Sequence, residues 1–557
     1  MLRRSWWGII LLGIGIRILV GAEPPQGFFL DDFQPKKATV PSFKKVTLTP
    51  SCPTVTVEID FGDTLTRVPR YIYGHNANVY MTQMVNEPTL IGYLKQLAPQ
   101  ILRYPGGNLS NLFFWNNQPG QLPEDVPDPL YGGVEKPYRE EFWFGRNDTA
   151  ITLSVDNYYK MLEMTNSSGL ICVNYSYARY SKSKNPVATA AKYAADWVRY
   201  DNGRTKYWEI GNENFGNWQA GYKINTADNQ DGQPEIITGE LYGQHFKAFA
   251  DSMRAAARSI GAEIKLGAGL LESAHDWHTP TEKTWNSGFF KQAGDAADFF
   301  VIHSYYTPWN ENSSVGTILN SAIPVTQEMM TFMQETARIN EVKMKPVGLT
   351  EWNIFAVGSK QQVSYINGIH AVLVLGELIK DKYGLACRWN LANNWDNGND
   401  HGMFSQGGEP NVPRWNPRPV FYYMTYFQQF CGDHLVNTNV VGDSDVVAYA
   451  STFSSGEAGV ILVNKGNSPK SVRLEFANFQ PGRRCYWYLL TGGKDNGDFS
   501  LQVFINGVGP ELPAGGPANL EKIKAYSTRI TKPLVFDLPP YSVQYLLVES
   551  DQKIPVK

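Results

Sequence analysis

Two short segments of the chain each carry a glutamate in a setting suited to breaking glycosidic bonds. They are WEIGNEN at residues 208–214 and GLTEWN at residues 348–353, and each has the pattern of a strand end followed by a loop. Hydrolysis with net retention needs a protonated carboxyl above the leaving oxygen and an ionised carboxylate below the anomeric carbon, about 5 Å apart. The two segments therefore indicate a retaining glycoside hydrolase, with Glu213 as proton donor and Glu351 as nucleophile.

The two carboxylates must come from different strands, and the middle of the chain supplies suitable elements. Short apolar runs alternate there with helical segments, such as the one whose apolar residues Val187, Ala191, Ala194 and Val198 share one face. This alternation predicts a (β/α)8 barrel, in which catalytic residues lie at the carboxyl ends of the strands. Glu213 is then expected after the fourth strand and Glu351 at the seventh. The eight runs are 71–73, 100–103, 170–174, 207–210, 264–268, 299–303, 347–350 and 385–390.

After an aromatic helix predicted at 420–430, the pattern changes to alternating apolar and polar residues with turn residues between the runs. Such alternation is typical of a β-sandwich. The run at 46–59 also alternates, so the N-terminal segment is expected to complete this sandwich. We therefore predict an α/β fold with strands joining the sandwich at 43–62, the catalytic barrel at 63–430 and the β-sandwich at 431–557.

The N-terminus has the pattern of a secretory signal peptide over residues 1–22. Arg3 and Arg4 precede an apolar run, and small residues follow at 20–22. Arg17 interrupts a run that is already shorter than the roughly 20 residues of a membrane span, although an uncleaved anchor stays open as an alternative. Residues 23–42 are expected to be a linker, and the mature protein is expected to be secreted or periplasmic, with no membrane span.

Composition argues against several other classes of function. The formal charge is −3 and no run of basic residues exceeds a pair, which disfavours nucleic acid as a partner. Five widely spaced cysteines form no zinc motif, although one disulfide stays open, and no nucleotide-binding motif occurs. We therefore expect no metal and no cofactor. Aromatic residues make up 13% of the chain, which suits stacking on sugar rings as well as core packing.

Five motifs in order resemble the α-L-arabinofuranosidase family of clan A glycoside hydrolases, over roughly residues 57–395. They are the two glutamate segments together with IYGH at 72–75, LRYPGGN at 102–108 and HSYY at 303–306. The segment LPPYS at 538–542 resembles the last strands of the accessory sandwich of that family. The resemblance implies the double-displacement mechanism, in which Glu351 forms a glycosyl ester and Glu213 acts as acid and then as base.

The resemblance also implies roles for surrounding residues. Asn212 would donate a hydrogen bond to the hydroxyl beside the anomeric carbon. Arg103 and Tyr305 would hold Glu351 ionised and oriented. Asn108, His303 and Trp395 would line the site of the sugar that is attacked.

Each of these roles has a plainer alternative. Arg103 could be a structural ion-pair partner, and His303 could be a buried core histidine. Tyr305 and Tyr306 point to opposite sides of a strand, and only the spacing of the family favours Tyr305. Either Trp389 or Trp395 could form the wall of the site, with the other packed in the core.

One departure from the family concerns the substrate. Where the arabinofuranosidases have a glutamate four residues after the first-strand glycine, this chain has Asn78, which lacks a charged acceptor for sugar hydroxyls. The connection at 109–147 is rich in aromatic residues, which could form subsites for a polymer or serve only as core.

These features favour a glycoside hydrolase acting on the backbone of a plant or algal polysaccharide, with a β-linked glycan as the expected substrate. Two alternatives stay open. One is an exo-acting α-L-arabinofuranosidase, and the other is a catalytically silent barrel that only binds glycans.

Overall fold

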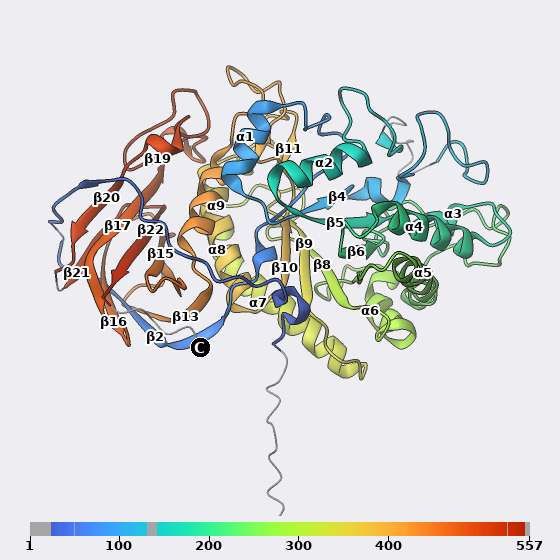
Figure 1. Cartoon of the computed structure of the whole chain (residues 1–557), viewed down its shortest axis with the longest axis horizontal. Helices are drawn as coiled ribbons and strands as arrows, with labels where there is room; N and C mark the ends of the chain where they lie inside the picture. Colours follow the sequence, from blue (N-terminus) through green and yellow to red (C-terminus); the bar gives the residue numbers. More distant parts are fainter. Residues whose placement is uncertain (1–23, 50, 131–141, 532, 552–557) are drawn as a thin grey trace, which may run out of the picture.

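The structure is a computed structural model that describes residues 24–49, 51–130, 142–531 and 533–551 (Figure 1). The predicted signal peptide at 1–22 lies outside these residues. Within the described ranges, no helix is long and apolar enough to cross a membrane. All five cysteines are free thiols, and only Cys52 is exposed.

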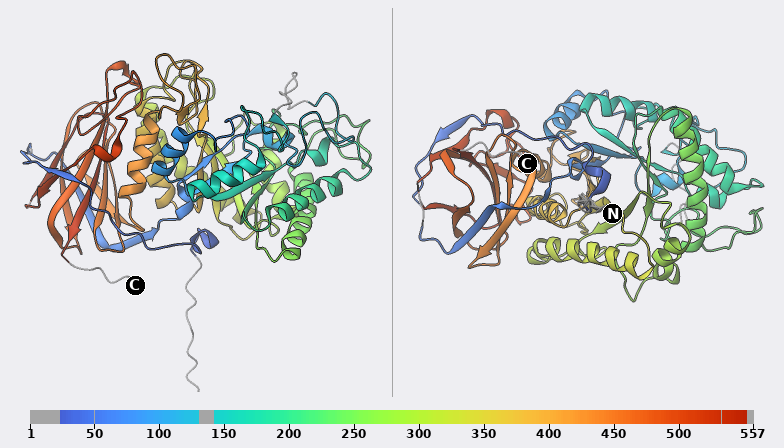
Figure 2. Two further views of the ribbon diagram at one scale, coloured as in Figure 1. Left: turned by 45° about the horizontal axis from the view of Figure 1, so that its top comes forward. Right: turned by 60° about the horizontal axis from the view of Figure 1, so that its bottom comes forward.

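Eight parallel strands close into a barrel in the predicted order, with helices packed around its outside (Figures 1 and 2). Their side chains are almost all buried, as is expected of strands covered on both faces. The strands are β3 (Gly74–Asn76), β4 (Ile101–Tyr104), β5 (Ser168–Val173), β6 (Tyr207–Ile210), β7 (Lys265–Gly269), β8 (Phe299–Tyr305), β9 (Val347–Asn353) and β10 (Leu385–Arg388).

Local sequence signals set where many of the helices begin. A serine or threonine hydroxyl accepts a hydrogen bond from the first turn at the start of α2 (Val155–Thr165), α5 (Gly239–Ser259), α6 (Pro280–Ala293), α7 (Val315–Ile339) and α8 (Tyr365–Lys380). In α6, Thr279 and Glu282 form a complete capping box. Proline occupies the first turn of α1 (Pro88–Leu97), α4 (Pro186–Asp201) and α9 (Pro419–Phe430).

The first barrel strand begins later than the apolar run at 71–73 predicted. Residues Arg70–Ile72 form a 3-10 turn, η2, and the strand itself is β3. A Cβ atom on Gly74 would collide with the carbonyl oxygen of Ala386 in β10, so only glycine allows the two strands to approach this closely. Tyr71 instead packs against Phe29 and Tyr207.

The segment expected to be a linker at 23–42 contains a 3-10 turn that packs against the barrel. This turn, η1 (Gly27–Leu30), buries Phe29 against Tyr207 and Phe299, with ring centroids 5.2 Å and 5.4 Å away. Tyr207 and Phe299 are the first residues of β6 and β8. The turn therefore closes the amino-terminal end of the barrel, opposite the end that carries the two glutamates.

The second domain is a sheet that folds around its own apolar core, as the β-sandwich prediction required. The N-terminal strand β2 (Val55–Arg67) lies between β13 (His434–Val441) and β16 (Lys470–Ala477), and Figure 1 shows it in blue among orange strands. This strand extends to Arg67, beyond the expected boundary at 62. The other strands are β1 (Phe43–Lys45), β14 (Val446–Thr452), β15 (Ala458–Asn464), β17 (Pro481–Gly492), β19 (Val503–Ile505), β20 (Ala525–Arg529), β21 (Leu534–Leu538) and β22 (Ser542–Ser550).

The sandwich packs against helices α8 and α9 of the barrel. The hydroxyl of Tyr449 donates to the carbonyl of Leu373 and to the carboxylate of Glu377, and that of Tyr545 donates to the carbonyl of Tyr423 over 2.8 Å. All of these groups are buried, so the two domains share a continuous interior. The sandwich thus supports the barrel from the side.

Candidate active site

Glu213 and Glu351 meet at the carboxyl end of the barrel. Glu351 lies within β9, and Glu213 follows β6 by three residues. One carboxylate oxygen of each, together with a ring nitrogen of His303, lie within 4.8 Å of one another. This short separation fits direct nucleophilic attack, because inverting enzymes keep their carboxyl groups about 6.5–9.5 Å apart to admit a water molecule.

The backbone at Glu213 adopts a left-handed conformation, with φ of 45°. Non-glycine residues seldom occupy this region, and such strain persists where surrounding contacts impose it. Asn111 provides such contacts, because its amide donates to the carbonyl of Asn212 over 2.7 Å and accepts from the side chain of Asn214 over 3.2 Å. Asn111 therefore holds the segment that presents Glu213.

Glu351 has the surroundings expected of a nucleophile. The hydroxyl of Tyr305 donates to Oε1 over 2.6 Å, and Nη1 of Arg103 lies 3.4 Å from Oε2. Tyr306 points away, since it is buried and its hydroxyl pairs with Thr326. The structure therefore places Tyr305, the residue favoured by family spacing, on the carboxylate.

Glu213 has a different set of partners. Nδ1 of His303 lies 2.9 Å from Oε1, while Nε1 of Trp218 and Nε2 of Gln219 donate to Oε2 over 3.0 Å and 3.2 Å. Gln219 also donates to Oδ1 of Asn108 over 2.7 Å, so Asn108 reaches the site through this glutamine. Trp218 and Gln219 were not predicted, although both lie close to Glu213 in the sequence.

Arg103 contacts both a buried ion-pair partner and the candidate nucleophile. It is fully buried, and its closest partner is Glu209 at 2.7 Å, with Glu351 at 3.4 Å. Glu209 was missed in the sequence, although it stands inside the same motif as Glu213. Its signal is a charged residue within a buried strand, which requires a buried counter-charge.

The amide of Asn212 is oriented by the same arginine. Nη2 of Arg103 donates to Oδ1 of Asn212 over 2.8 Å. The Nδ2 group of Asn212 is buried and has no hydrogen-bond partner among the described residues. A buried donor without a partner is costly, so this group is suited to donate to a sugar hydroxyl.

The protonation of the two glutamates depends on His303. Burial opposes protonation of His303, but the carboxylates of Glu351 and Glu213 outweigh it and raise the pKa of the ring. Burial raises the pKa of Glu213, yet the hydrogen bond and charge of His303 lower it overall. Burial also raises the pKa of Glu351, against the opposing charges of His303 and Arg103. His303 therefore controls how readily Glu213 holds a proton.

A third carboxyl group lies on the Glu213 side of the site. Glu272 follows β7, and burial together with the charge of Glu213 raises the pKa of Glu272 to about 7. Its Oε1 lies 3.4 Å from the hydroxyl of Ser273. No sequence motif pointed to this residue, because its position depends on how the loop after β7 folds back.

Two further predicted residues take different positions. Asn78 is buried and donates to the carbonyl of Pro105 over 3.1 Å, while its Oδ1 has no partner among the described residues. Trp395 is half-buried and packs against Arg418, whose guanidinium lies 5.9 Å from the ring centroid. None of the contacts described for Trp395 reaches either catalytic glutamate.

Trp389, the alternative to Trp395, stands directly after β10 at the mouth of the barrel. A Cβ atom on Gly107 would lie only 2.5 Å from the indole of Trp389, and Gly107 has a φ of 61°. The glycine is thus required both by its conformation and by the close approach of the ring. Trp389 therefore lies at the end of the barrel beside the motif at 102–108, and the place of Trp395 in the sugar site stays a prediction.

The aromatic connection at 109–147 serves mainly as core. Five of its aromatic residues are almost fully buried, which favours the core reading over polymer subsites. Two others, Tyr131 and Tyr138, lie outside the described residues. The buried residues are Phe113, Phe114, Trp115, Trp143 and Phe144.

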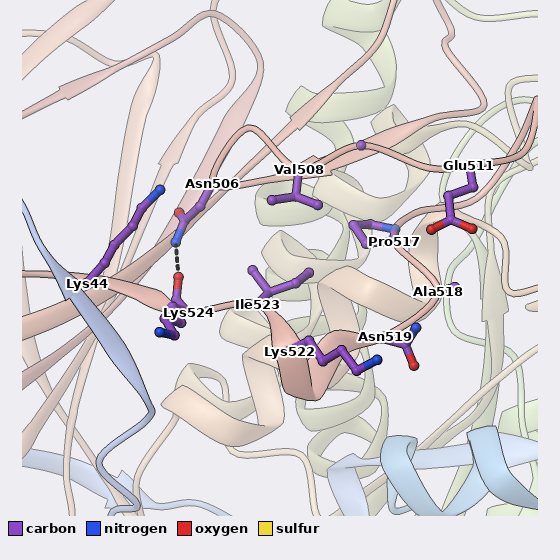
Figure 3. Close-up of a pocket in the computed structure, with 11 residues that line it drawn as sticks. Lys44, Asn506, Val508, Glu511, Pro517, Ala518, Asn519, Lys522, Ile523 and Lys524 are labelled. Atoms are coloured by element: carbon purple, nitrogen blue, oxygen red, sulfur yellow. Dashed lines mark hydrogen bonds between the residues drawn. The ribbon is translucent and has the colours of Figure 1, made fainter.

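Within the described ranges, Glu213, His303 and Glu351 also form the one group of three side chains with the spacing of a metal site. In this arrangement Glu213 accepts from Trp218 and pairs with His303, and Glu351 accepts from Tyr305. A separate cavity of about 470 Å³ lies in the sandwich (Figure 3). Its lining combines lysines with Glu511 and amide groups and contains none of the groups described above.

Comparison with known proteins agrees with the motifs. The family model described as the alpha-L-arabinofuranosidase 1 domain matches residues 93–313, which include Arg103, Glu213 and His303. The chain resembles the α-L-arabinofuranosidases. Glu351 and Asn78 lie outside the matched segment.

Similar proteins support the same family. An intracellular exo-alpha-(1->5)-L-arabinofuranosidase of Streptomyces lividans is 25% identical over 52% of this chain and 40% of its own length. A probable alpha-L-arabinofuranosidase C of Aspergillus terreus is 24% identical over 48% of this chain and 51% of its own length. The chain thus spans about half or less of these two relatives.

A solved structure extends the likeness to both domains. The alpha-L-arabinofuranosidase of Thermotoga maritima, in its arabinose complex, superposes with a TM-score of 0.61 at 18% identity. The match covers 89% of this chain and all of that one. At this level of identity the superposition establishes the shared barrel-and-sandwich fold.

Proposed function

We propose that the protein is a retaining glycoside hydrolase that releases α-L-arabinofuranosyl residues. The observation that carries this proposal is the pair Glu213 and Glu351, whose carboxylate oxygens approach within 4.8 Å from different strands. Their partners differ, because Glu351 contacts Tyr305 and Arg103 while Glu213 contacts His303 and Trp218. Two carboxyl groups in different surroundings can take different roles.

In the first step, a carboxylate oxygen of Glu351 attacks the anomeric carbon while Glu213 transfers its proton to the leaving oxygen. The glycosidic bond breaks, and a glycosyl ester forms on Glu351. In the second step, Glu213 removes a proton from water, which attacks the anomeric carbon and frees Glu351. Asn212 would donate to the neighbouring hydroxyl in both steps, where the bond strengthens as positive charge develops on the ring.

The choice of an α-L-arabinofuranoside replaces the expected β-linked backbone. It is supported by the family match over residues 93–313 and by the arabinofuranosidases among the relatives. The burial of the aromatic connection at 109–147 also removes one argument for a polymer-binding groove. An exo-acting arabinofuranosidase is therefore the better-supported reading.

A polysaccharide backbone stays as the second candidate because of Asn78 and an exposed tryptophan. Asn78 replaces a charged acceptor for furanose hydroxyls, and its Oδ1 is unpartnered among the described residues. Trp277 is 75% exposed on a loop at the catalytic end of the barrel. Such a ring could hold a longer glycan.

The test is to incubate the purified protein with 4-nitrophenyl α-L-arabinofuranoside, arabinan, arabinoxylan and β-linked glucans and xylans. Free arabinose from the first three supports the proposal, and oligosaccharides from a β-linked backbone support the second candidate. Glu351→Gln should abolish turnover while retaining sugar binding. A protein that only binds glycans would show no turnover before or after this change.

Replacing Glu213 distinguishes the role of the proton donor from that of the nucleophile Glu351. Glu213→Ala should lower turnover of arabino-oligosaccharides by about 10²–10⁴-fold, the usual contribution of general acid catalysis. The loss should be smaller for the aryl glycoside, whose leaving group needs no proton. Added azide should restore part of the activity and yield an arabinosyl azide of retained configuration.

Export of the protein is also proposed, on the basis of the signal-like pattern at 1–22. Expression of the full chain with sequencing of the N-terminus of the secreted protein tests it. Cleavage near residue 22 supports export, and an intact N-terminus in the cell interior contradicts it.

A further inference from the structure

The loop between β7 and α6 carries polar and aromatic groups at the carboxyl end of the barrel, and its Glu272 interacts electrostatically with Glu213. It comprises residues 270–279, and it contains Glu272, Ser273, His275 and Trp277. None of these residues takes part in the mechanism described above. The position of Glu272 matters because the proton donor Glu213 faces the leaving group, so a loop on this side can contact that part of the substrate.

The start of the loop is held by both of its neighbours. The amide N–H of Leu270 donates to the carbonyl of Val301 in β8 over 2.8 Å. Asn286 of α6 accepts from the N–H of Leu271 and donates to its carbonyl, over 2.9 Å and 2.8 Å. Glu272, the next residue, therefore has a defined position beside β8, the strand that carries His303.

The outer part of the loop is ordered by its own side chains. The hydroxyl of Ser273 lies 3.1 Å from Nε2 of His275, and the ring of His275 stacks on Trp277 with a centroid distance of 5.0 Å and an angle of 12°. Lys283 of α6 donates to the carbonyl of Asp276 over 2.7 Å. One face of the indole is thus supported, while the side chain is 75% exposed.

Exposed tryptophans concentrate at this end of the barrel. Within the described ranges, three tryptophans are more than a third exposed, namely Trp218, Trp277 and Trp309. They lie on the loops after β6, β7 and β8 respectively, at the carboxyl ends of the strands. Trp218 donates to Glu213, whereas Trp309 packs edge-on against Phe355, which stacks on Tyr305 beside the nucleophile. Trp277 is therefore the exposed tryptophan that shares a loop with Glu272.

We propose that the loop after β7 binds the leaving group over two successive sugar residues, with Glu272 hydrogen-bonded to the first and Trp277 stacked on the second. This inference rests on the proposed function and adds the substrate class, an uncharged oligosaccharide of at least three residues. A carboxyl group accepts or donates hydrogen bonds to hydroxyls according to its protonation. An acidic sugar would be repelled by the ionised form of Glu272, so uronic acids are disfavoured at this position.

The test compares substrates that differ only in the length of the leaving group. The value of kcat/KM is measured for 4-nitrophenyl α-L-arabinofuranoside and for α-(1→5)-linked arabinobiose, arabinotriose and arabinotetraose. In Trp277→Ala, kcat/KM for the aryl glycoside and for arabinobiose should stay within about twofold of the wild-type values. For the two longer substrates, kcat/KM should fall about five- to tenfold. Trp277→Phe should recover much of the loss, because a stacking face is retained.

Two controls locate the effect. Trp309→Ala removes an equally exposed ring from the neighbouring loop and should leave the dependence on length unchanged. Glu272→Gln should lower kcat/KM for arabinobiose as well as for the longer substrates. Equal losses on all four substrates in Trp277→Ala, or the same length dependence in Trp309→Ala, would overturn the assignment.

A binding measurement tests this inference independently of the proposed function. Calorimetric titration of the Glu351→Gln protein with arabinotriose and xylotriose should show weaker binding when Trp277→Ala is added. If the wild-type protein hydrolyses none of the glycosides, the proposed function fails, and the titrations still decide whether Trp277 contacts a sugar. Unchanged affinity for both trisaccharides would refute the subsite.

Discussion

Arg103 donates from Nη2 to Oδ1 of Asn212 over 2.8 Å, and this contact turns the other end of the amide into the active site. The Nδ2 group of Asn212 is then buried without a partner in the described part of the chain. The same arginine pairs with Glu209 and reaches Glu351. One buried cation thus orients a substrate donor and contacts two carboxylates.

Asn212→Ala should lower kcat/KM by about 10²–10³-fold, comparable to the loss of one transition-state donor in other enzymes. The matched measurement uses a 2-deoxy aryl arabinofuranoside, which lacks the hydroxyl that Asn212 is expected to bind. For the wild-type protein, kcat/KM should be lower on the 2-deoxy substrate by a similar factor. For Asn212→Ala, removing the hydroxyl from the substrate should lower kcat/KM little further. Full additivity of the two losses would show that Asn212 and this hydroxyl do not interact.

Tyr305→Phe should reduce kcat by about 10- to 100-fold, because a hydrogen bond to a charged group contributes roughly 1.5–3 kcal/mol. The variant removes only the hydroxyl that lies 2.6 Å from Glu351. Tyr306→Phe is the control, since its hydroxyl pairs with Thr326 away from the site. Similar kcat values for the two variants would argue against a role for Tyr305 at the nucleophile.

His303→Gln should move the alkaline limb of the kcat/KM profile to higher pH. Glu213 must be protonated to act as acid, and activity falls as pH rises through its pKa. The charge and hydrogen bond of His303 lower that pKa against the effect of burial, so their loss raises it. Profiles of the wild-type and variant proteins on arabinobiose provide the measurement, and a shift to lower pH would contradict this account.

Glu209→Gln should destabilise the fold by about 3–5 kcal/mol, because it leaves Arg103 without its closest counter-charge in a buried position. Urea unfolding of the two proteins measures the difference. Lys192→Gln breaks the exposed pair with Asp196 and should cost about 0.5 kcal/mol or less. Equal losses for the two variants would show that burial of the Arg103 pair adds nothing.

Residues adjacent in the sequence were the ones that sequence analysis could assign. Asn212 and Glu213 share one motif, and Tyr305 follows His303 at the spacing of one strand face, so their mutual arrangement follows from local geometry. The role of Trp395 was different. Residues 389–395 follow β10 and include the short strand β11 (Ala392–Asn393). The packing of Trp389 over Gly107 depends on a contact between the segments that follow the second and eighth barrel strands.

The sequence by itself determined the alternation of eight strands with helices, the strand ends that carry Glu213 and Glu351, and the sandwich that both ends of the chain complete. These features depend on local periodicity, which short-range sterics and burial impose. Only the tertiary structure decided the pairing of Arg103 with Glu209, the place of Glu272 beside Glu213 and the burial of the aromatic connection at 109–147. Each of these depends on contacts between residues far apart in the sequence, and those contacts exist only after the barrel has closed.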